Sequence, residues 1–233
     1  MSVGWNPWHG CRKISEGCRH CYVYRQDERH DKDSSEVRKT SAFNLPVRRS
    51  RDGRFKVPAG EMVYTCFTSD FLVEEADTWR AEAWEMIRTR SDLRFFFITK
   101  RIDRLMQVLP PDWGDGYENT GAAAPRRLPL LLGAPLRHKL IVCAPLLGPL
   151  DIAQYLTSEI EEVSAGGESG SDARPCDFDW VLSIRRQCLD ADIPFCYHQT
   201  GARLVKDGPG STKTAGCTAS AAGSSTRRPA RRE

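Results

Sequence analysis

Strand and helix patterns alternate along the chain between residues 62 and 199. Continuous apolar runs predict buried strands, and apolar positions spaced three and four residues apart predict helices. The predicted strands are 62–67, 94–99, 138–145, 160–167 and 193–199, and the predicted helices are 74–90, 102–109 and 176–191. Apolar strands that alternate with helices are typical of a parallel sheet, so we expect an α/β fold. It would be a partial (β/α) barrel or an open parallel sheet with helices outside.

The first 60 residues lack this alternation. Residues 1–21 are rich in Trp and Cys and have too few periodic apolar positions for a regular element, so we expect a ligand-binding cysteine loop. Residues 22–36 are highly charged and weakly helical. Residues 38–56 carry seven Lys and Arg around an Asp52-Gly53 turn signal, which predicts a basic loop or hairpin. This stretch would either bind phosphates or form an ordinary solvated surface.

The end of the chain differs in composition from the rest. Residues 207–233 draw 19 of their 27 positions from Gly, Ala, Ser, Thr and Pro and contain no large apolar residue. Because such a segment buries too little to offset the entropy of ordering, we expect a disordered tail. Residues 1–206 are expected to form a single α/β domain.

Composition and charge narrow the functional classes. The 233 residues are 40% apolar and 28% charged, which is typical of globular proteins and excludes collagen-like or wholly disordered chains. The longest apolar stretch, 128–136, is interrupted by prolines and is too short to span a membrane. Because the N-terminus does not resemble a secretory signal, we expect a cytoplasmic protein without a membrane partner. The net charge of +3 equals that of residues 207–233, so residues 1–206 are neutral and only a local basic patch would favour nucleic acid.

Candidate ligand contacts follow the predicted strands. In parallel sheets, ligands bind at the carboxyl ends of the strands. The candidates are Thr68, Ser69 and Asp70 after the first predicted strand, Thr99, Lys100 and Arg101 after the second, residues 144–146 after the third, Gly166, Gly167, Glu168 and Ser169 after the fourth, and residues 198–200 after the fifth. Each of these residues would serve equally well as a helix cap or turn residue.

The most specific pattern is Cys11-x6-Cys18-x2-Cys21. The chain has nine cysteines, an odd number that favours reduced thiols or metal ligands over disulfides. Three interpretations compete for the loop: a structural zinc with a fourth ligand such as His9, His20 or a distant Cys, an iron–sulfur cluster with one iron left open, or three unligated thiols. The other cysteines of residues 1–206 lie in predicted strands or at a predicted helix, where buried thiols behave as small apolar groups.

Several motifs together resemble the phage-associated gene-product thirty-seven/sixty-eight family. They are WNPWHGCRKISEGCRHCY, TSDF, FFFITKR, PDWGDGYEN, GGESG, ARPCDFDW and HQTGA, in that order over residues 1–206. The family has no assigned biochemical function, and its three-cysteine loop is similar to that of radical S-adenosylmethionine (SAM) enzymes. Here the final C-x2-C matches the usual C-x3-C-x2-C, while the first gap has six residues.

The resemblance implies a set of roles for the candidate residues. Cys11, Cys18 and Cys21 would hold a [4Fe–4S] cluster whose open iron chelates SAM, and His20 would lie near the adenine. Glu168 would accept from the SAM amino group, and Gly166 and Gly167 would let the backbone approach. Ser69, Asp70, Thr99 and Lys100 would contact the ribose, the carboxylate or the substrate.

Two functions from different classes follow. The first is a radical SAM-like iron–sulfur enzyme acting on an unknown substrate, with nucleic acid or a co-encoded protein as the expected partner. The second is a zinc-stabilised, non-catalytic module that binds nucleic acid or assists another protein.

The resemblance also predicts a defect after Asn119. Related sequences continue there with a strand, whereas this chain continues with TGAAAPRRLP. We therefore expect that a strand is missing within residues 119–127, leaving an unpaired gap in the sheet. A pair of reading-frame lesions would explain both this gap and the unusual tail, and would make the chain a decayed copy.

Overall fold

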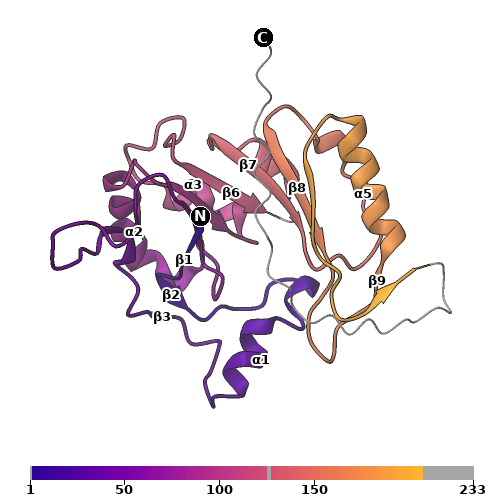
Figure 1. Cartoon of the computed structure of the whole chain (residues 1–233), viewed down its shortest axis with the longest axis horizontal. Coiled ribbons are helices and arrows are strands. Elements are labelled where there is room, and N and C mark those ends of the chain that lie inside the picture. Colours follow the sequence, from indigo (N-terminus) through magenta and orange to yellow (C-terminus); the bar gives the residue numbers. More distant parts are fainter. Residues whose placement is uncertain (1, 125–126, 207–233) are drawn as a thin grey trace, which may run out of the picture.

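The fold is built on a parallel sheet that curls into a half-barrel (Figure 1). The computed structural model describes residues 2–124 and 127–206. Within these residues the sheet has seven strands in the order β1-β4-β5-β6-β7-β8-β10, all parallel. The predicted α/β partial barrel is confirmed, while the expected tail at 207–233 lies outside the described residues. The strands are β1 (Ser2–Trp5), β4 (Met62–Thr65), β5 (Arg94–Ile98), β6 (Thr120–Ala124), β7 (His138–Cys143), β8 (Ile160–Gly166) and β10 (Phe195–Gln199).

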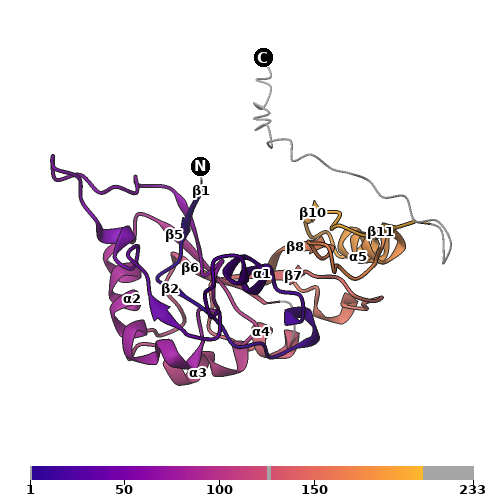
Figure 2. The same ribbon diagram turned by 90° about the horizontal axis from the view of Figure 1, so that it is seen from below.

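Helices follow most of the strands. Figure 2 shows α2 (Asp77–Thr89), α3 (Leu105–Val108) and α4 (Leu128–Leu132) along one side of the sheet, and α5 (Phe178–Asp190) beside β8 and β10. The predicted helices at 74–90, 102–109 and 176–191 correspond to α2, α3 and α5, the first two preceded by a 3₁₀ turn. Asp177 caps α5 by accepting from the backbone N–H of Asp179 at 2.9 Å. No helix among the described residues is long and apolar enough to cross a membrane.

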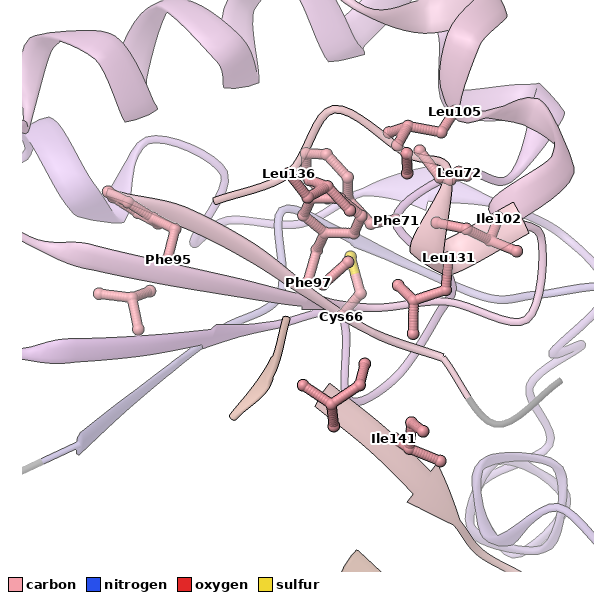
Figure 3. Packing of buried hydrophobic residues seen from close by; sticks show 14 of the residues in the cluster. Cys66, Phe71, Leu72, Phe95, Phe97, Ile102, Leu105, Leu131, Leu136 and Ile141 are labelled. Atoms are coloured by element: carbon pink, nitrogen blue, oxygen red, sulfur yellow. The ribbon is translucent and has the colours of Figure 1, made fainter. Parts of the chain in front are cut away.

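The core between the sheet and α2 contains a cluster of aromatic side chains, of which Figure 3 shows Phe71 and Phe97 among aliphatic neighbours. The ring centroid of Phe71 lies 5.0 Å from the ring centroid of Phe97 and 5.0 Å from that of Trp84. Phe97 comes from β5 and Trp84 from α2, and Phe71 comes from the segment that joins β4 to α2. Because such contacts add to the burial of apolar area, this cluster fixes α2 against the carboxyl half of the strands.

The expectation that residues 1–21 form only a loop is wrong at its start. Ser2–Trp5 form β1, an edge strand that pairs in parallel with β4. Trp5 is fully buried, and its indole N–H donates to the carbonyl of Phe43 at 3.0 Å. Trp8–His9 form β2, which pairs with β3 (Arg38–Lys39). A strand of four residues has too few inward positions to show a period, so the pattern did not reveal it.

The expected missing strand is also present. Residues 120–124 form β6, which pairs with β5 on one side and β7 on the other, so the sheet has no gap there. Its sequence, TGAAA, carries almost no strand signal because Gly and Ala are depleted in strands. Small residues suit this position because a Cβ on Gly121 would lie 2.6 Å from the Phe96 ring and from the Cβ of His138. The expected gap, which motivated the hypothesis of a decayed copy, is therefore filled by β6.

The basic stretch does contain a hairpin. An antiparallel bridge joins Arg49 to Phe55 around the Asp52-Gly53 turn, as the turn signal predicted. Before it, residues 38–47 hold β3 and a 3₁₀ turn at Leu45–Val47. Two further short strands, β9 (Cys176–Asp177) and β11 (Leu204–Val205), pair in parallel beside the main sheet.

We predict that Gly121→Ala lowers the free energy of unfolding by about 1–3 kcal/mol, because the added methyl group overpacks the space between Phe96 and His138. Urea unfolding would measure the loss. The control is Gly148→Ala, whose new Cβ meets no atom within 4 Å, and which should change stability by less than about 0.5 kcal/mol. Equal effects of the two substitutions would contradict the tight packing of β6.

Candidate functional site

The cysteine loop, residues 10–21, crosses the carboxyl edge of the sheet. It begins at Gly10, whose N–H donates to the carbonyl of Thr68 at 3.1 Å and whose carbonyl accepts from the Ser69 hydroxyl. Gly10 has a φ of +92°, and a Cβ there would lie 2.3 Å from the carbonyl oxygen of Glu36. Glycine is therefore required where the chain turns into the loop. The loop ends at Cys21, which directly precedes α1 (Tyr22–Glu28).

Four basic side chains hold the backbone of this loop. Lys100 Nζ donates to the carbonyl of Gly17 at 3.2 Å, and Arg101 Nη2 donates to the carbonyl of Arg12 at 2.9 Å. From the other side, Arg25 Nη1 donates to the carbonyl of His20 at 2.9 Å and Arg174 Nη2 to that of Glu16 at 2.8 Å. These charge-assisted bonds fix an irregular segment.

Two of the three thiols lie beside a cation. Cys18 Sγ is 3.6 Å from Lys100 Nζ and 3.3 Å from the Ser15 hydroxyl. Cys11 Sγ is 3.5 Å from Arg101 Nη1. Burial, assisted by the Asp70 carboxylate, raises the pKa of Cys11 to about 11. Burial also acts to raise the pKa of Cys18, but hydrogen bonds from Ser15 and the backbone, together with the Lys100 charge, lower it below its usual value.

All three thiols lie within electrostatic reach of Tyr24. The pKa of Tyr24 is raised first by burial and then by the negative charges of Cys11, Cys21 and Cys18. Its hydroxyl donates to the carbonyl of Cys11. The predicted grouping of the three cysteines around one place in the fold is therefore consistent with the described loop.

The side chains do not converge on one point. Among the described residues, no group of three or more His, Cys, Asp and Glu is placed to hold a single metal ion. A mononuclear zinc site needs such convergence, whereas each thiolate of a four-iron cluster binds a different iron and so lies farther from the others. His9, one candidate for a fourth zinc ligand, is paired with Asp27 at 2.6 Å. The described loop therefore does not form a preformed mononuclear zinc site.

Asp70 and Thr99 hold the turns beneath the loop together. The Asp70 carboxylate is buried and accepts from the Thr99 hydroxyl and the Lys100 N–H, both at 2.7 Å, and from the Leu72 N–H at 2.9 Å. It also pairs with Arg101 Nη1 at 3.3 Å. The structure thus brings the candidates Ser69, Asp70 and Thr99 under the loop, with side chains that bond within the protein. Lys100 alone among these four reaches a thiol.

The Gly-Gly-Glu turn after β8 meets the loop from the other side. Glu168 is buried, accepts from Arg174 Nη2 at 2.7 Å and Nε at 3.0 Å, and lies 3.9 Å from His20 Nδ1. Burial acts to raise the pKa of Glu168, but the bonds from Arg174 lower it. Cβ atoms on Gly166 and Gly167 would lie 2.5 Å from His198 Nε2 and 2.3 Å from the Thr200 carbonyl oxygen. Both glycines are therefore explained by packing against the end of β10.

Two cavities flank the loop. One of about 700 Å³ is lined by Arg19, His20, Cys21 and Arg25, among others. A smaller one of about 320 Å³ is lined by Ser15, Gly17, Lys100, Cys143 and Pro145, and lies where β5 and β7 end. Both volumes are in the range of small-molecule sites.

Of the three arginines that contact the loop, Arg101 was a candidate because it follows the second predicted strand, whereas Arg25 and Arg174 were not candidates. Arg174 belongs to the ARPCDFDW motif, so it carried a sequence signal. Arg25 carried none, because its contact with Ser169 spans 144 residues of sequence.

The remaining described cysteines lie outside the loop sequence, although Cys143 lines the smaller cavity beside it. Cys66, Cys143, Cys176 and Cys188 are buried, as expected of small apolar groups, and burial raises the pKa of Cys143 to about 12. Cys176 lies in β9 rather than at the start of the helix. Cys196 is exposed on the edge strand β10, so the expectation that it is buried is wrong. Edge strands have no neighbour to cover their outer side.

Asp70→Asn should destabilise the protein by about 3 kcal/mol, because it leaves the buried Arg101 without its buried anionic partner. Thermal or urea unfolding measures the change. Glu74→Gln is the control, since Glu74 also contacts Arg101, at 3.4 Å, but is 55% exposed, and it should cost less than about 0.5 kcal/mol. If Asp70→Asn leaves stability unchanged, Asp70 does not have the structural role described here.

Comparison with known proteins places the chain in a family without giving it an activity. No curated protein and no solved structure matches the chain. A family model described as "Protein of unknown function (DUF5131)" matches residues 1–226, which include the whole cysteine loop and all seven strands of the described sheet. Because this match extends over nearly the entire sequence, the chain belongs to the DUF5131 family of proteins of unknown function.

Proposed function

We propose that this protein is a radical SAM-like iron–sulfur protein whose cluster is held by Cys11, Cys18 and Cys21. The observation that carries the proposal is the loop itself: three half-buried thiols on one segment, with a lysine or arginine within 3.6 Å of two of the sulfurs. The loop follows the first strands at the carboxyl edge of a half-barrel, where active sites of such sheets lie.

The residues of the loop would divide the work of binding the cluster. Each of the three thiolates would bind one iron of a [4Fe–4S] cluster, and the fourth iron would remain open to SAM. Lys100 and Arg101 would offset the negative charge of the thiolates. When bound, the cluster would supply the electron for reductive cleavage of SAM, while the protein supplies placement.

The larger cavity is the proposed place for SAM. It is lined by Cys21 and His20, the residue we propose lies near the adenine. An ionised carboxylate has about four acceptor sites, and Arg174 occupies three of those on Glu168 through its backbone N–H, Nε and Nη2. One site remains for the SAM amino group. Lys100 lines the smaller cavity, so it is the proposed partner for the substrate. The family resemblance makes nucleic acid the proposed substrate class.

A zinc-stabilised, non-catalytic module is the second candidate. It is favoured by His20 Nδ1, which is buried and makes no hydrogen bond with any residue that the structure describes. A neutral imidazole nitrogen next to Cys21 is a suitable fourth zinc ligand after a rearrangement of the loop.

Anaerobic reconstitution with iron and sulfide separates the two candidates. We expect about four irons per chain and absorbance at about 400 nm. Cys18→Ala should lose the cluster, whereas Cys196→Ala, which changes an exposed thiol on β10, should keep it. Full iron content in the Cys18 variant, or zinc in place of iron in the parent protein, would reject the cluster.

SAM cleavage tests the second half of the proposal. With the cluster reduced, the parent protein should convert SAM to methionine and 5′-deoxyadenosine, and Cys11→Ala and Cys21→Ala should form neither product. Chromatography of the products measures this. A reconstituted protein that holds four irons and leaves SAM intact would retain the cluster and refute SAM cleavage.

A further inference from the structure

The basic hairpin, residues 48–56, is a rigid projection. The Ser50 N–H donates to the Arg54 carbonyl at 2.8 Å, and the Lys56 N–H donates to the Arg48 carbonyl at 2.8 Å. The Gly53 N–H closes the turn onto the Ser50 carbonyl at 3.0 Å, with a Gly53 φ of +82°. This arrangement is the common three-residue hairpin loop, which suits the natural twist of the strands. The hairpin forms the loop at the far left of Figures 1 and 2.

Arginines fix the base of the hairpin to the sheet. The Phe55 ring has the guanidinium of Arg49 at 3.9 Å from its centroid and that of Arg90 at 4.0 Å. Two groups this close to one ring centroid must occupy its opposite faces. Arg90 is fully buried and also donates to the carbonyls of Pro46 and Val57. The hairpin is therefore preorganised, so it loses little conformational entropy when it binds a partner.

The hairpin concentrates positive charge. Five of its nine residues are Lys or Arg and one is acidic, which gives a net charge of +4 on a body that is neutral as a whole. Its single acid, Asp52, is paired with Arg54 at 2.6 Å. Arg51 and Lys56 are exposed, and the described residues give neither side chain a hydrogen bond or an ion pair. Like charges this close repel one another, and the packing of the hairpin does not require a positive charge at Arg51 or Lys56.

We infer that the basic hairpin is a docking surface for the phosphate backbone of duplex nucleic acid. Guanidinium and ammonium groups on a fixed frame match the regularly spaced phosphates of a duplex. Single-stranded nucleic acid is a poorer fit because it requires exposed aromatic rings for stacking, and both faces of Phe55 are covered. A membrane surface is also a poorer fit, because residues 50–54, SRDGR, contain no apolar side chain to insert.

The hairpin and the cysteine loop lie at opposite ends of the strands. It leads into β4, and its neighbours Arg90 and Asp92 precede β5, so its base lies at the amino ends of these strands. A cavity of about 950 Å³ is lined by hairpin residues together with Arg90 and Asp92, and it gives the surface a concave side. The bound duplex would be held at the edge opposite the thiols. The inference therefore does not rest on the proposed iron–sulfur chemistry.

Fluorescence anisotropy with a labelled duplex DNA, using the full chain over a series of salt concentrations, tests the inference. Arg51→Gln with Lys56→Gln should weaken binding by roughly tenfold or more and lower the slope of log K against log salt by about 2. The matched control is Arg185→Gln with Arg186→Gln, which removes the same charge from two exposed positions on α5. The control should bind within about twofold of the parent protein.

Other outcomes would overturn the inference. They are no salt-dependent binding of the duplex by the parent protein, equal losses in the hairpin and α5 variants, tighter binding of single strands, or tighter binding of phosphatidylserine vesicles that depends on Arg51 and Lys56. The basic residues of the last segment are tested separately by changing Arg227, Arg228, Arg231 and Arg232 to Gln. Loss of binding in that variant alone, with the hairpin variant unaffected, would assign the activity to the end of the chain.

Discussion

The site depends on how the protein satisfies the backbone of an irregular loop. Residues 10–21 contain only a short 3₁₀ turn, so most of their carbonyls lack the partners that a helix or a sheet would give them. Lysine and arginine side chains from the turns after β5 and β8 and from α1 donate to these carbonyls. Two of these side chains, Lys100 and Arg101, also lie within 3.6 Å of a thiol sulfur. These two residues therefore provide both structural support for the loop and electrostatic support for thiolates.

The buried Asp70 extends this arrangement into the sheet. Arg101 is only 4% exposed and holds a charge that needs a partner, which Asp70 supplies at 3.3 Å. Asp70 in turn accepts from the turn after β5, so the ends of two neighbouring strands and the loop above them are connected through one carboxylate. Arg101 also lies 3.5 Å from Cys11 Sγ, so this carboxylate is one residue removed from a thiol of the loop.

Sequence patterns identified the parts of the fold that carry a continuous apolar run or a clear helical period. The strand RFFFI and the amphipathic α5 were predicted because each buries a regular set of apolar positions. β1 and β6 were missed for different reasons: β1 is too short to show a period, and β6 consists of Thr, Gly and Ala, whose fit depends on Phe96 and His138 from neighbouring strands. The cysteines were predicted as a group because they are close in sequence. The cations that hold them were less visible, since Arg25 and Arg174 act across 144 and 158 residues.

The long sequence separation between the loop and Arg174 affects when the loop receives its support during synthesis. The first half of the loop's support, from Lys100 and Arg101, exists once β5 has formed, but Arg174 and the turn at Ser169 emerge from the ribosome much later. At about 5–20 residues per second, the interval between Cys21 and Arg174 is on the order of ten seconds or more. During this time the three thiols lie on a loop that is held from one side only. The loop can therefore be supported from both sides only after β8 has been synthesised, at a point before β10 is complete.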